Sequence, residues 1–111
     1  MWSPFNKSRL AVLCSKKFFV IDISKSNRGP KFISRRIQVE VGVPITDLCW
    51  INETSVAIAS LDHIKLYDLS VDVLSPTKTV FTENGDSIKS LSYSGQGCHL
   101  YLIVENASSP N

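Results

Sequence analysis

Short apolar runs, and runs in which apolar and polar residues alternate, recur along the whole chain, and helical periodicity is almost absent. Such runs, separated by clusters of Ser, Asn, Gly, Pro and Asp, are typical of β-strands. The Val, Ile, Phe and Tyr residues that fill them suit a pleated, partly buried surface. The pattern predicts an all-β protein with strands at residues 9–14, 18–23, 31–41, 45–50, 55–60, 63–69, 78–82, 87–93 and 99–104.

Residues that accept a positive φ, or that fix φ, lie between these strands, where the chain must reverse. Asn84-Gly85 is the strongest of these signals, because both residue types accept the left-handed conformations of a tight hairpin turn. It predicts that the strands on either side of it are antiparallel neighbours. The other clear turn sequences are residues 27–30 (NRGP), 42–44 (GVP) and 94–97 (SGQG).

An internal repeat organises the predicted strands. Residues 8–24 (SRLAVLCSKKFFVIDIS) align without a gap on residues 54–70 (TSVAIASLDHIKLYDLS), with apolar residues at nearly every inward position. Residues 45–50 (ITDLCW) also resemble residues 88–93 (IKSLSY), and Trp2 stands in the first unit where Trp50 stands in the second. The period is about 43–48 residues with four strands in each unit, which is the spacing of β-propeller blades.

The second unit resembles a repeat of the WD40 family. It offers Gly42, a segment ending in Trp50 that is similar to the family's V-x-x-L-x-W strand, and a strand of small and apolar residues that ends in Ser60. Asp62 then supplies the turn, and residues 64–68 (IKLYD) are similar to the closing I-x-L-W-D. Near the start of the chain, Trp2-Ser3-Pro4 is similar to the family's W-S-P.

The chain departs from the family pattern at several positions. It has no Gly-His dipeptide, and Tyr67 and Ile21 stand where the family usually has Trp. The family's hydrogen-bonded His–Ser–Asp–Trp network is therefore incomplete in every unit, although Ser60 and Asp62 are both present in one of them. The resemblance covers residues 2–104 and identifies a divergent set of blades.

The resemblance implies an all-β fold of antiparallel four-stranded blades of a WD40-like β-propeller, incomplete in this chain. We expect the partial propeller to occupy residues 1–105, with a flexible tail at 106–111. The first unit spans about residues 2–41, the second about 42–86 and a partial third about 87–104. Because a blade must be covered by its neighbours, we expect a fragment of a longer propeller.

In a propeller, the turns between the second and third strands of each blade share a rim with the loops that join successive blades, and partners usually dock there. The candidate binding residues on this rim are Lys16, Lys17, Asp62 and His63. The remaining residues of interest have structural roles. We expect core packing for Trp2 and Trp50, hydrogen bonding at strand ends for Asp22 and Asp68, and repeat positions in the blade for Ser60 and Tyr67.

Composition narrows the function classes. The chain has 43% hydrophobic and 20% charged residues, which is typical of a globular protein. Its net charge of +2 is small for a nucleic-acid-binding domain. Three cysteines without metal-ligand spacing (Cys14, Cys49 and Cys98) indicate reduced thiols in an intracellular protein. No apolar run has the length of a membrane span, and the N-terminus does not resemble a signal peptide.

These observations predict a non-catalytic scaffold in an intracellular complex, cytoplasmic or nuclear, without cofactor or metal. Its partners would be proteins, the remaining blades or further copies of the chain. Asp47, Asp62 and His63 could form an acid–base or metal set, but no catalytic motif accompanies them. The alternative is a small independent β-barrel that binds nucleic acid through basic residues 16–36, and it requires exposed aromatic rings for stacking, from Phe18, Phe19 or Phe32.

Overall fold

Three antiparallel sheets follow one another along the chain in the computed structural model, which describes residues 1–25, 29–71, 75–95 and 99–105. The first sheet has the order β1 (Arg9–Leu13), β2 (Lys17–Lys25), β3 (Lys31–Glu40). The second has the order β4 (Asp47–Trp50), β5 (Ser55–Ser60), β6 (His63–Asp68), β7 (Lys78–Phe81), and the third pairs β8 (Ser87–Ser94) with β9 (His99–Glu105).

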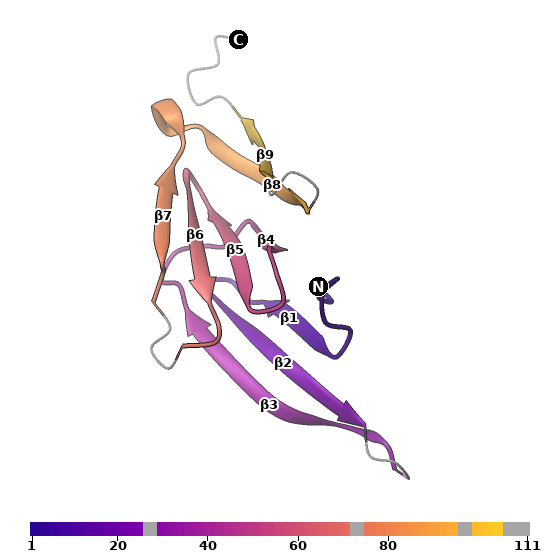
Figure 1. Cartoon of the computed structure of the whole chain (residues 1–111). Coiled ribbons are helices and arrows are strands. Elements are labelled where there is room, and N and C mark those ends of the chain that lie inside the picture. Colours follow the sequence, from indigo (N-terminus) through magenta and orange to yellow (C-terminus); the bar gives the residue numbers. More distant parts are fainter. Residues whose placement is uncertain (26–28, 72–74, 96–98, 106–111) are drawn as a thin grey trace.

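The second sheet lies between the other two, with the first on one side and the third on the other (Figure 1). One apolar core joins the first and second sheets and includes Phe18, Val39, Trp50 and Ile58. A second core joins the second and third sheets and includes Ala57, Ile64, Ile88 and Leu91. The chain is therefore a stack of three sheets with two apolar interfaces.

Strand β5, in the middle of the stack, contains a continuous run of apolar residues in the sequence. Val56 and Ile58 belong to the core shared with the first sheet, whereas Ala57 and Ala59 belong to the core shared with the third. All four are fully buried because both faces of the sheet are covered. By contrast, every residue of β7 at the outer edge is exposed.

All nine predicted strands form, so the predicted all-β antiparallel fold is confirmed, and the strand ends differ from the prediction by at most two residues. The prediction for Asn84-Gly85 is wrong. Residues Glu83–Gly85 form a 3₁₀ turn, and the strands that flank it, β7 and β8, belong to different sheets. The positive φ of Gly85 (71°) ends this turn and directs the chain into the third sheet.

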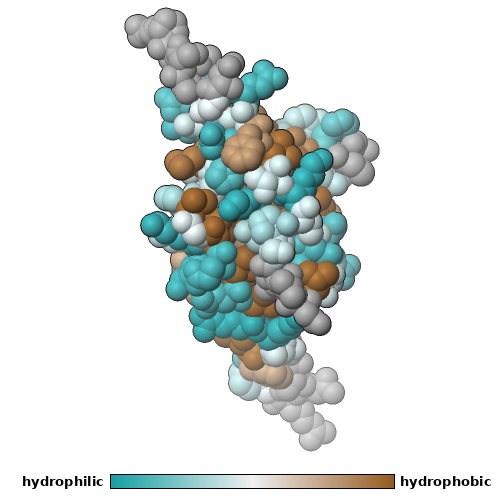
Figure 2. All heavy atoms as spheres, turned by 90° about the vertical axis from the view of Figure 1, so that its left-hand side faces the viewer, coloured by the Kyte–Doolittle hydropathy of each residue, from teal (hydrophilic) through white to brown (hydrophobic). Residues whose placement is uncertain are grey.

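Apolar residues also reach the surface of the stack. Figure 2 shows hydrophobic side chains between hydrophilic ones on the side of the molecule that lies to the left in Figure 1. Exposed apolar residues lie in both outer sheets as well, among them Trp2, Val12, Tyr101 and Ile103. The described ranges contain no helix long and apolar enough to cross a membrane.

Candidate interaction surface

The first and second sheets pair their strands in the same register, displaced by 46 residues. Arg9 faces Asp22 in the first sheet, and Ser55 faces Asp68 in the second. The four pairs that follow in β1 and β2 also recur at this displacement, ending with Leu13 opposite Phe18 and Ala59 opposite Ile64. The gapless alignment of the two sequence units therefore corresponds to the same hydrogen-bonded hairpin built twice.

The segments that enter these hairpins also repeat. Trp2 forms a β-bridge with Leu10, and Trp50 pairs with Val56, which is the repeat equivalent of Leu10. In the turn that follows, the Oδ1 atom of Asn6 accepts a hydrogen bond from the Ser8 amide. The Oδ1 atom of Asn52 accepts the matching bond from Thr54. Trp2 therefore marks the place of a short first strand in the first sheet.

The two turns chosen as the binding rim, between β1 and β2 and between β5 and β6, accept backbone hydrogen bonds from the segments that lead into the next sheet. The carbonyl of Ser15 accepts a hydrogen bond from the Ile45 amide, 2.9 Å away, ahead of β4. The carbonyl of Leu61, the equivalent of Ser15, accepts one from the Ile88 amide of β8 at 2.7 Å. The Thr82 amide likewise donates to the Asp62 carbonyl at 2.8 Å. The bonds from Ile45 and Ile88 join each turn to the segment that enters the next sheet, whereas the Thr82 bond continues the β6–β7 pairing within the second sheet.

The four candidate rim residues differ in how accessible they are. Lys16 is exposed, whereas the Nζ atom of Lys17 lies 5.6 Å from the centre of the Phe19 ring. The side chain of Asp62 is 45% exposed and lies 3.1 Å from Nδ1 of His63. His63 is buried and packs against the Phe81 ring, so its side chain offers little surface for a contact with a partner. In the described residues no hydrogen bond or ion pair joins Lys16 or Lys17 to Asp62 or His63.

Both carboxylate oxygens of Asp47 accept backbone hydrogen bonds, so Asp47 does not join Asp62 and His63 in a catalytic set. Its Oδ1 atom accepts a hydrogen bond from the Leu48 amide at 2.8 Å, and its Oδ2 atom accepts one from the Leu91 amide at 2.7 Å. The second bond crosses from the second sheet to the third. The described residues contain no group of three His, Cys, Asp or Glu side chains that could hold a metal ion.

Ser60 and Tyr67 occupy buried repeat positions. The Ser60 hydroxyl is fully buried, and its Oγ atom has no hydrogen-bond partner among the described residues. Tyr67 is 2% exposed and meets the Phe18 ring edge-on at 5.5 Å between centres. Burial raises the pKa of the Tyr67 phenol. Asp62 is directed toward His63, so it forms no side-chain network with Ser60.

The two repeat-equivalent tryptophans lie in different environments. Trp50 is 2% exposed in the core between the first and second sheets, and its Nε1 atom donates to the Met1 carbonyl at 3.2 Å. Trp2 is 53% exposed, so the prediction that it packs in the core is wrong. The reason is its position on the face of the first sheet opposite the second sheet, which no described part of the chain covers.

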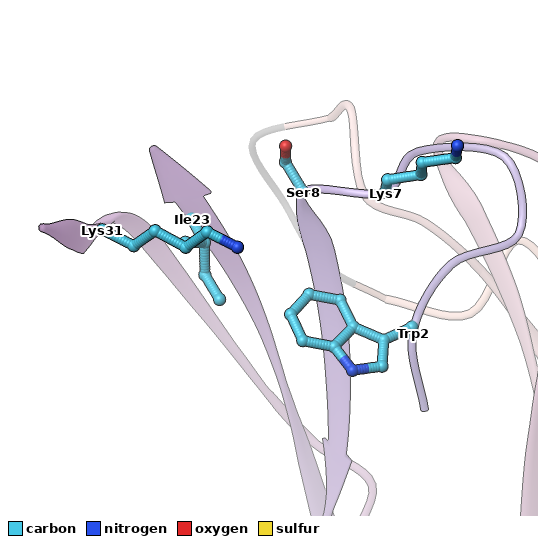
Figure 3. Close-up of a pocket in the computed structure, with 5 residues that line it drawn as sticks. All are labelled: Trp2, Lys7, Ser8, Ile23 and Lys31. Carbon is cyan, nitrogen blue, oxygen red and sulfur yellow. The ribbon is translucent and has the colours of Figure 1, made fainter. Parts of the chain in front are cut away.

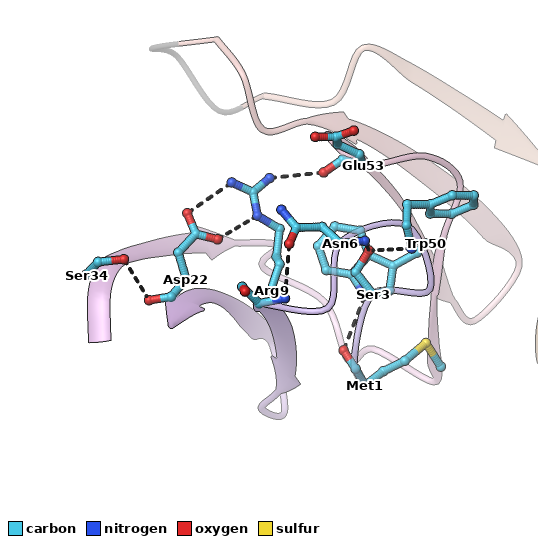
Figure 4. A network of polar contacts seen from close by, with 10 residues as sticks. Met1, Ser3, Asn6, Arg9, Asp22, Ser34, Trp50 and Glu53 are labelled. Atoms are coloured by element: carbon cyan, nitrogen blue, oxygen red, sulfur yellow. Dashed lines mark hydrogen bonds and ion pairs between the residues drawn. The ribbon is translucent and has the colours of Figure 1, made fainter. Parts of the chain in front are cut away.

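The two strand-end aspartates make different contacts. The Oδ1 atom of Asp68 accepts hydrogen bonds from the amide and hydroxyl of Ser70, and these bonds lower the pKa of the Asp68 carboxyl. Asp22 instead binds the Arg9 guanidinium at both oxygens, 2.6 and 3.0 Å away (Figure 4). Asp22 is therefore an ion-pair residue, and this role was not predicted for it.

Arg9 was missed by the sequence analysis, although it reaches across the interface between the first two sheets. Its Nη1 atom donates to the Glu53 carbonyl at 3.1 Å while Asp22 holds the rest of the guanidinium (Figure 4). The hydrogen bond with Asp22 is the largest cause that raises the pKa of Arg9, and the charge of Glu53 adds to it. The sequence marks only the turn that Arg9 reaches, because Asn52-Glu53-Thr54 repeats Asn6-Lys7-Ser8.

Of the three cysteines, Cys14 is half-buried and Cys49 is buried, and both are free thiols. Burial, with a smaller contribution from Asp47, raises the pKa of the Cys49 thiol, which keeps it protonated at neutral pH. Cys98 and the predicted tail at 106–111 lie outside the described residues.

The aromatic residues required by the nucleic-acid alternative are mostly unavailable for stacking. Phe18 is fully buried, and Phe19 is covered by the cations of Lys17 and Arg36, whose guanidinium carbon lies 4.4 Å from the ring centre. Phe32 alone among the three is largely exposed. Base stacking on a platform of several rings is therefore not supported at these positions.

Comparisons with known proteins find similarity to a short stretch of one much longer protein. No protein-family model matches the chain. Protein purity of essence from Drosophila pseudoobscura pseudoobscura is 36% identical over 76 residues, which is 67% of this chain and 1% of that protein. The chain therefore spans about one hundredth of the length of the curated relative that it matches.

Proposed function

We propose that the chain is a non-catalytic interaction module made of consecutive WD40-like blades, forming part of a longer intracellular propeller that scaffolds a protein complex. The observation that carries the proposal is the repeated register of the first two sheets. Five successive cross-strand pairs recur at a displacement of 46 residues, from Arg9–Asp22 and Ser55–Asp68 onward. Propellers are built from such sheets, each covering the next.

The order of the strands also supports this proposal. The three sheets contain three, four and two strands in chain order, and they correspond to the predicted units at about residues 2–41, 42–86 and 87–104, with β9 ending one residue beyond the third. This is the arrangement of one blade without its first strand, one whole blade, and the first half of a third. The place of the missing first strand is marked by Trp2, which bridges to Leu10.

The uncovered outer faces support the assignment to a longer propeller. Leu10 and Val12 are the repeat equivalents of Val56 and Ile58, which are fully buried by the first sheet. Val12 is 37% exposed, because no described residue covers that face. The great length of the relative is consistent with additional sheets on either side. Partner proteins would then bind at the rim turns, where Lys16 and Asp62 remain accessible.

Engineered disulfides test the repeated register. The Ile23 amide donates to the Ser8 carbonyl and the Leu69 amide to the Thr54 carbonyl, so Arg9–Asp22 and Ser55–Asp68 are both non-hydrogen-bonded pairs. Such pairs have Cα atoms about 4.5 Å apart, which a disulfide can span. In a background without the native cysteines, Arg9→Cys/Asp22→Cys and Ser55→Cys/Asp68→Cys should each oxidise within one chain. Peptide mapping under non-reducing conditions detects both links.

The matched control moves one cysteine by a single residue. Arg9→Cys/Ile21→Cys places the two side chains on opposite faces of the sheet and should not oxidise. Formation of only one of the two native-register disulfides, or efficient oxidation of the control, would mean that the two sheets do not repeat. The proposed function would then lose the observation on which it rests.

A further inference from the structure

A pocket of about 250 Å³ lies at one end of the first sheet, lined by Trp2, Lys7, Ser8, Ile23 and Lys31. The Trp2 ring and the Ile23 side chain form apolar walls, and Lys31 extends toward the space between them (Figure 3). Neither Lys7 nor Lys31 has an ion-pair partner among the described residues. The pocket therefore combines an accessible indole with the uncompensated ammonium group of Lys31, while the Lys7 side chain extends outward from its rim (Figure 3).

Three of the five pocket residues have counterparts of the same kind at equivalent places in the second sheet. Trp2, Ser8 and Ile23 correspond to Trp50, Thr54 and Leu69. The match is structural as well as sequential. The Ile23 amide donates to the Ser8 carbonyl at 2.8 Å, and the Leu69 amide donates to the Thr54 carbonyl at 2.7 Å. The pocket is thus the first-sheet copy of a site that occurs again in the second sheet.

In the second sheet this site is filled by the first sheet. Trp50 and Leu69 are each 2% exposed, and the Met1 carbonyl accepts the hydrogen bond of the Trp50 indole. The Arg9 guanidinium reaches the turn that carries Glu53 and donates to the Glu53 carbonyl at 3.1 Å. The occupant of the filled site is therefore a neighbouring β-sheet that presents a cation beside an acidic turn.

In the first sheet the charge of this turn is reversed. Lys7 stands where Glu53 stands in the second sheet, inside matching Asn-x-Ser and Asn-x-Thr turns. Lys31 adds a second positive charge. The surrounding sequence has the same sign, because residues 1–41 carry nine Lys or Arg and only two Asp or Glu. A cation in the position of Arg9 would be repelled here, whereas a carboxylate would be attracted.

We propose that this pocket is the docking site for an acidic β-strand of the sheet that adjoins the first sheet in the longer propeller, whose carboxylate lies beside Lys31 while its apolar residues cover Trp2 and Ile23. The partner strand belongs to a sheet that covers the first sheet as the first sheet covers the second. The proposal names the chemistry of the strand that covers the first sheet. It rests on the proposed function, because it assumes that the repeated sheets continue.

Tryptophan fluorescence tests the anion preference of the pocket directly. Trp2 and Trp50 are the two tryptophans of the chain, and only Trp2 is accessible to a quencher. Iodide should quench Trp2 about twofold or more better than caesium, relative to the ratio for free tryptophan, because the lysines concentrate anions nearby. The double variant Lys7→Glu/Lys31→Glu should invert this order. Lys78→Glu, a single charge reversal at exposed β7, should leave it unchanged.

The second measurement uses short peptides in which valine alternates with glutamate, glutamine or lysine. The glutamate peptide should shift the Trp2 emission to shorter wavelength, with binding that weakens as salt is added, and the other two should not. Lys7→Glu/Lys31→Glu should transfer the preference to the lysine peptide. Equal binding of the three peptides, unchanged preference in the double variant, or tighter binding of a single-stranded oligonucleotide would overturn the proposal. These results leave the disulfide test of the repeated register unaffected, so the two failures are distinguishable.

Discussion

Replacing Trp50 with alanine is expected to lower the free energy of unfolding by about 3–5 kcal/mol, the usual cost of deleting a large buried aromatic side chain. Trp50 lies in the core between the first and second sheets and also donates a hydrogen bond to the Met1 carbonyl. Small domains have total stabilities of about 5–15 kcal/mol, so this loss should remove a large share of the stability of the chain. Urea titration followed by far-ultraviolet circular dichroism, at low protein concentration, measures the change.

The matched control is Trp2→Ala, at the equivalent position of the repeat. Because Trp2 is 53% exposed and covered by no described residue, its removal should cost only about 0.5 kcal/mol or less. A small effect at Trp50, or equal losses at the two positions, would contradict the burial that separates them. The pair of variants thus measures how much the first sheet stabilises the second.

The second large effect is expected for Asp47→Ala, with a loss of about 2–3 kcal/mol. The carboxylate of Asp47 accepts hydrogen bonds from the amides of Leu48 and Leu91, and the second bond joins two sheets. Leu91 is 8% exposed, so its amide would be left without an acceptor in a largely dry interface. Hydrogen exchange should show faster exchange in β8 and β9, with smaller changes in the first sheet.

The control for this variant is Asp68→Ala. The Asp68 carboxylate also accepts two hydrogen bonds, but both come from Ser70 at the end of one strand of the second sheet. Its loss should change stability less and should leave exchange in β8 unchanged. If Asp47→Ala left β8 as protected as in the unaltered chain, the Asp47–Leu91 contact would not be what holds the third sheet in place.

The strands of this protein could be predicted from the sequence in part because the repeat makes several of them visible twice. Residues 9–13 (RLAVL) and 55–59 (SVAIA) both have one polar residue followed by four apolar ones, and in both cases they form the first full strand of a hairpin. Local pattern and hairpin register agree here, because strand pairing between sequence neighbours depends on few distant contacts.

The connection at Asn84-Gly85 could not be predicted from its own residues. Asn-Gly favours a tight reversal, and Gly85 does adopt a positive φ. Whether the following strand returns to the same sheet is decided elsewhere, by the Ile88 amide bonding to the Leu61 carbonyl and by the packing of Ile88 and Leu91 against the second sheet. These contacts direct the chain to the next sheet, against the local preference for a hairpin.

The candidate site was only partly visible in the sequence. Lys16 and Asp62 are accessible, as exposed turn residues should be, but His63 packs against Phe81 because the following strand passes beside it. The pocket beside Trp2 was missed because Trp2 was expected to pack like Trp50. The difference between them depends on whether another sheet covers the face, which no local pattern encodes.

The central claim is that the chain is a stack of sheets with an uncovered apolar face at each end, and sedimentation velocity over a range of concentrations tests it most directly. The account predicts reversible association, with species heavier than the 12.3 kDa chain appearing as concentration rises. The double variant Val12→Lys/Ile103→Lys, which places a charge on each outer face, should remain monomeric. An unaltered chain that stays a 12.3 kDa monomer at every concentration would contradict the account, because its outer faces would then need no cover.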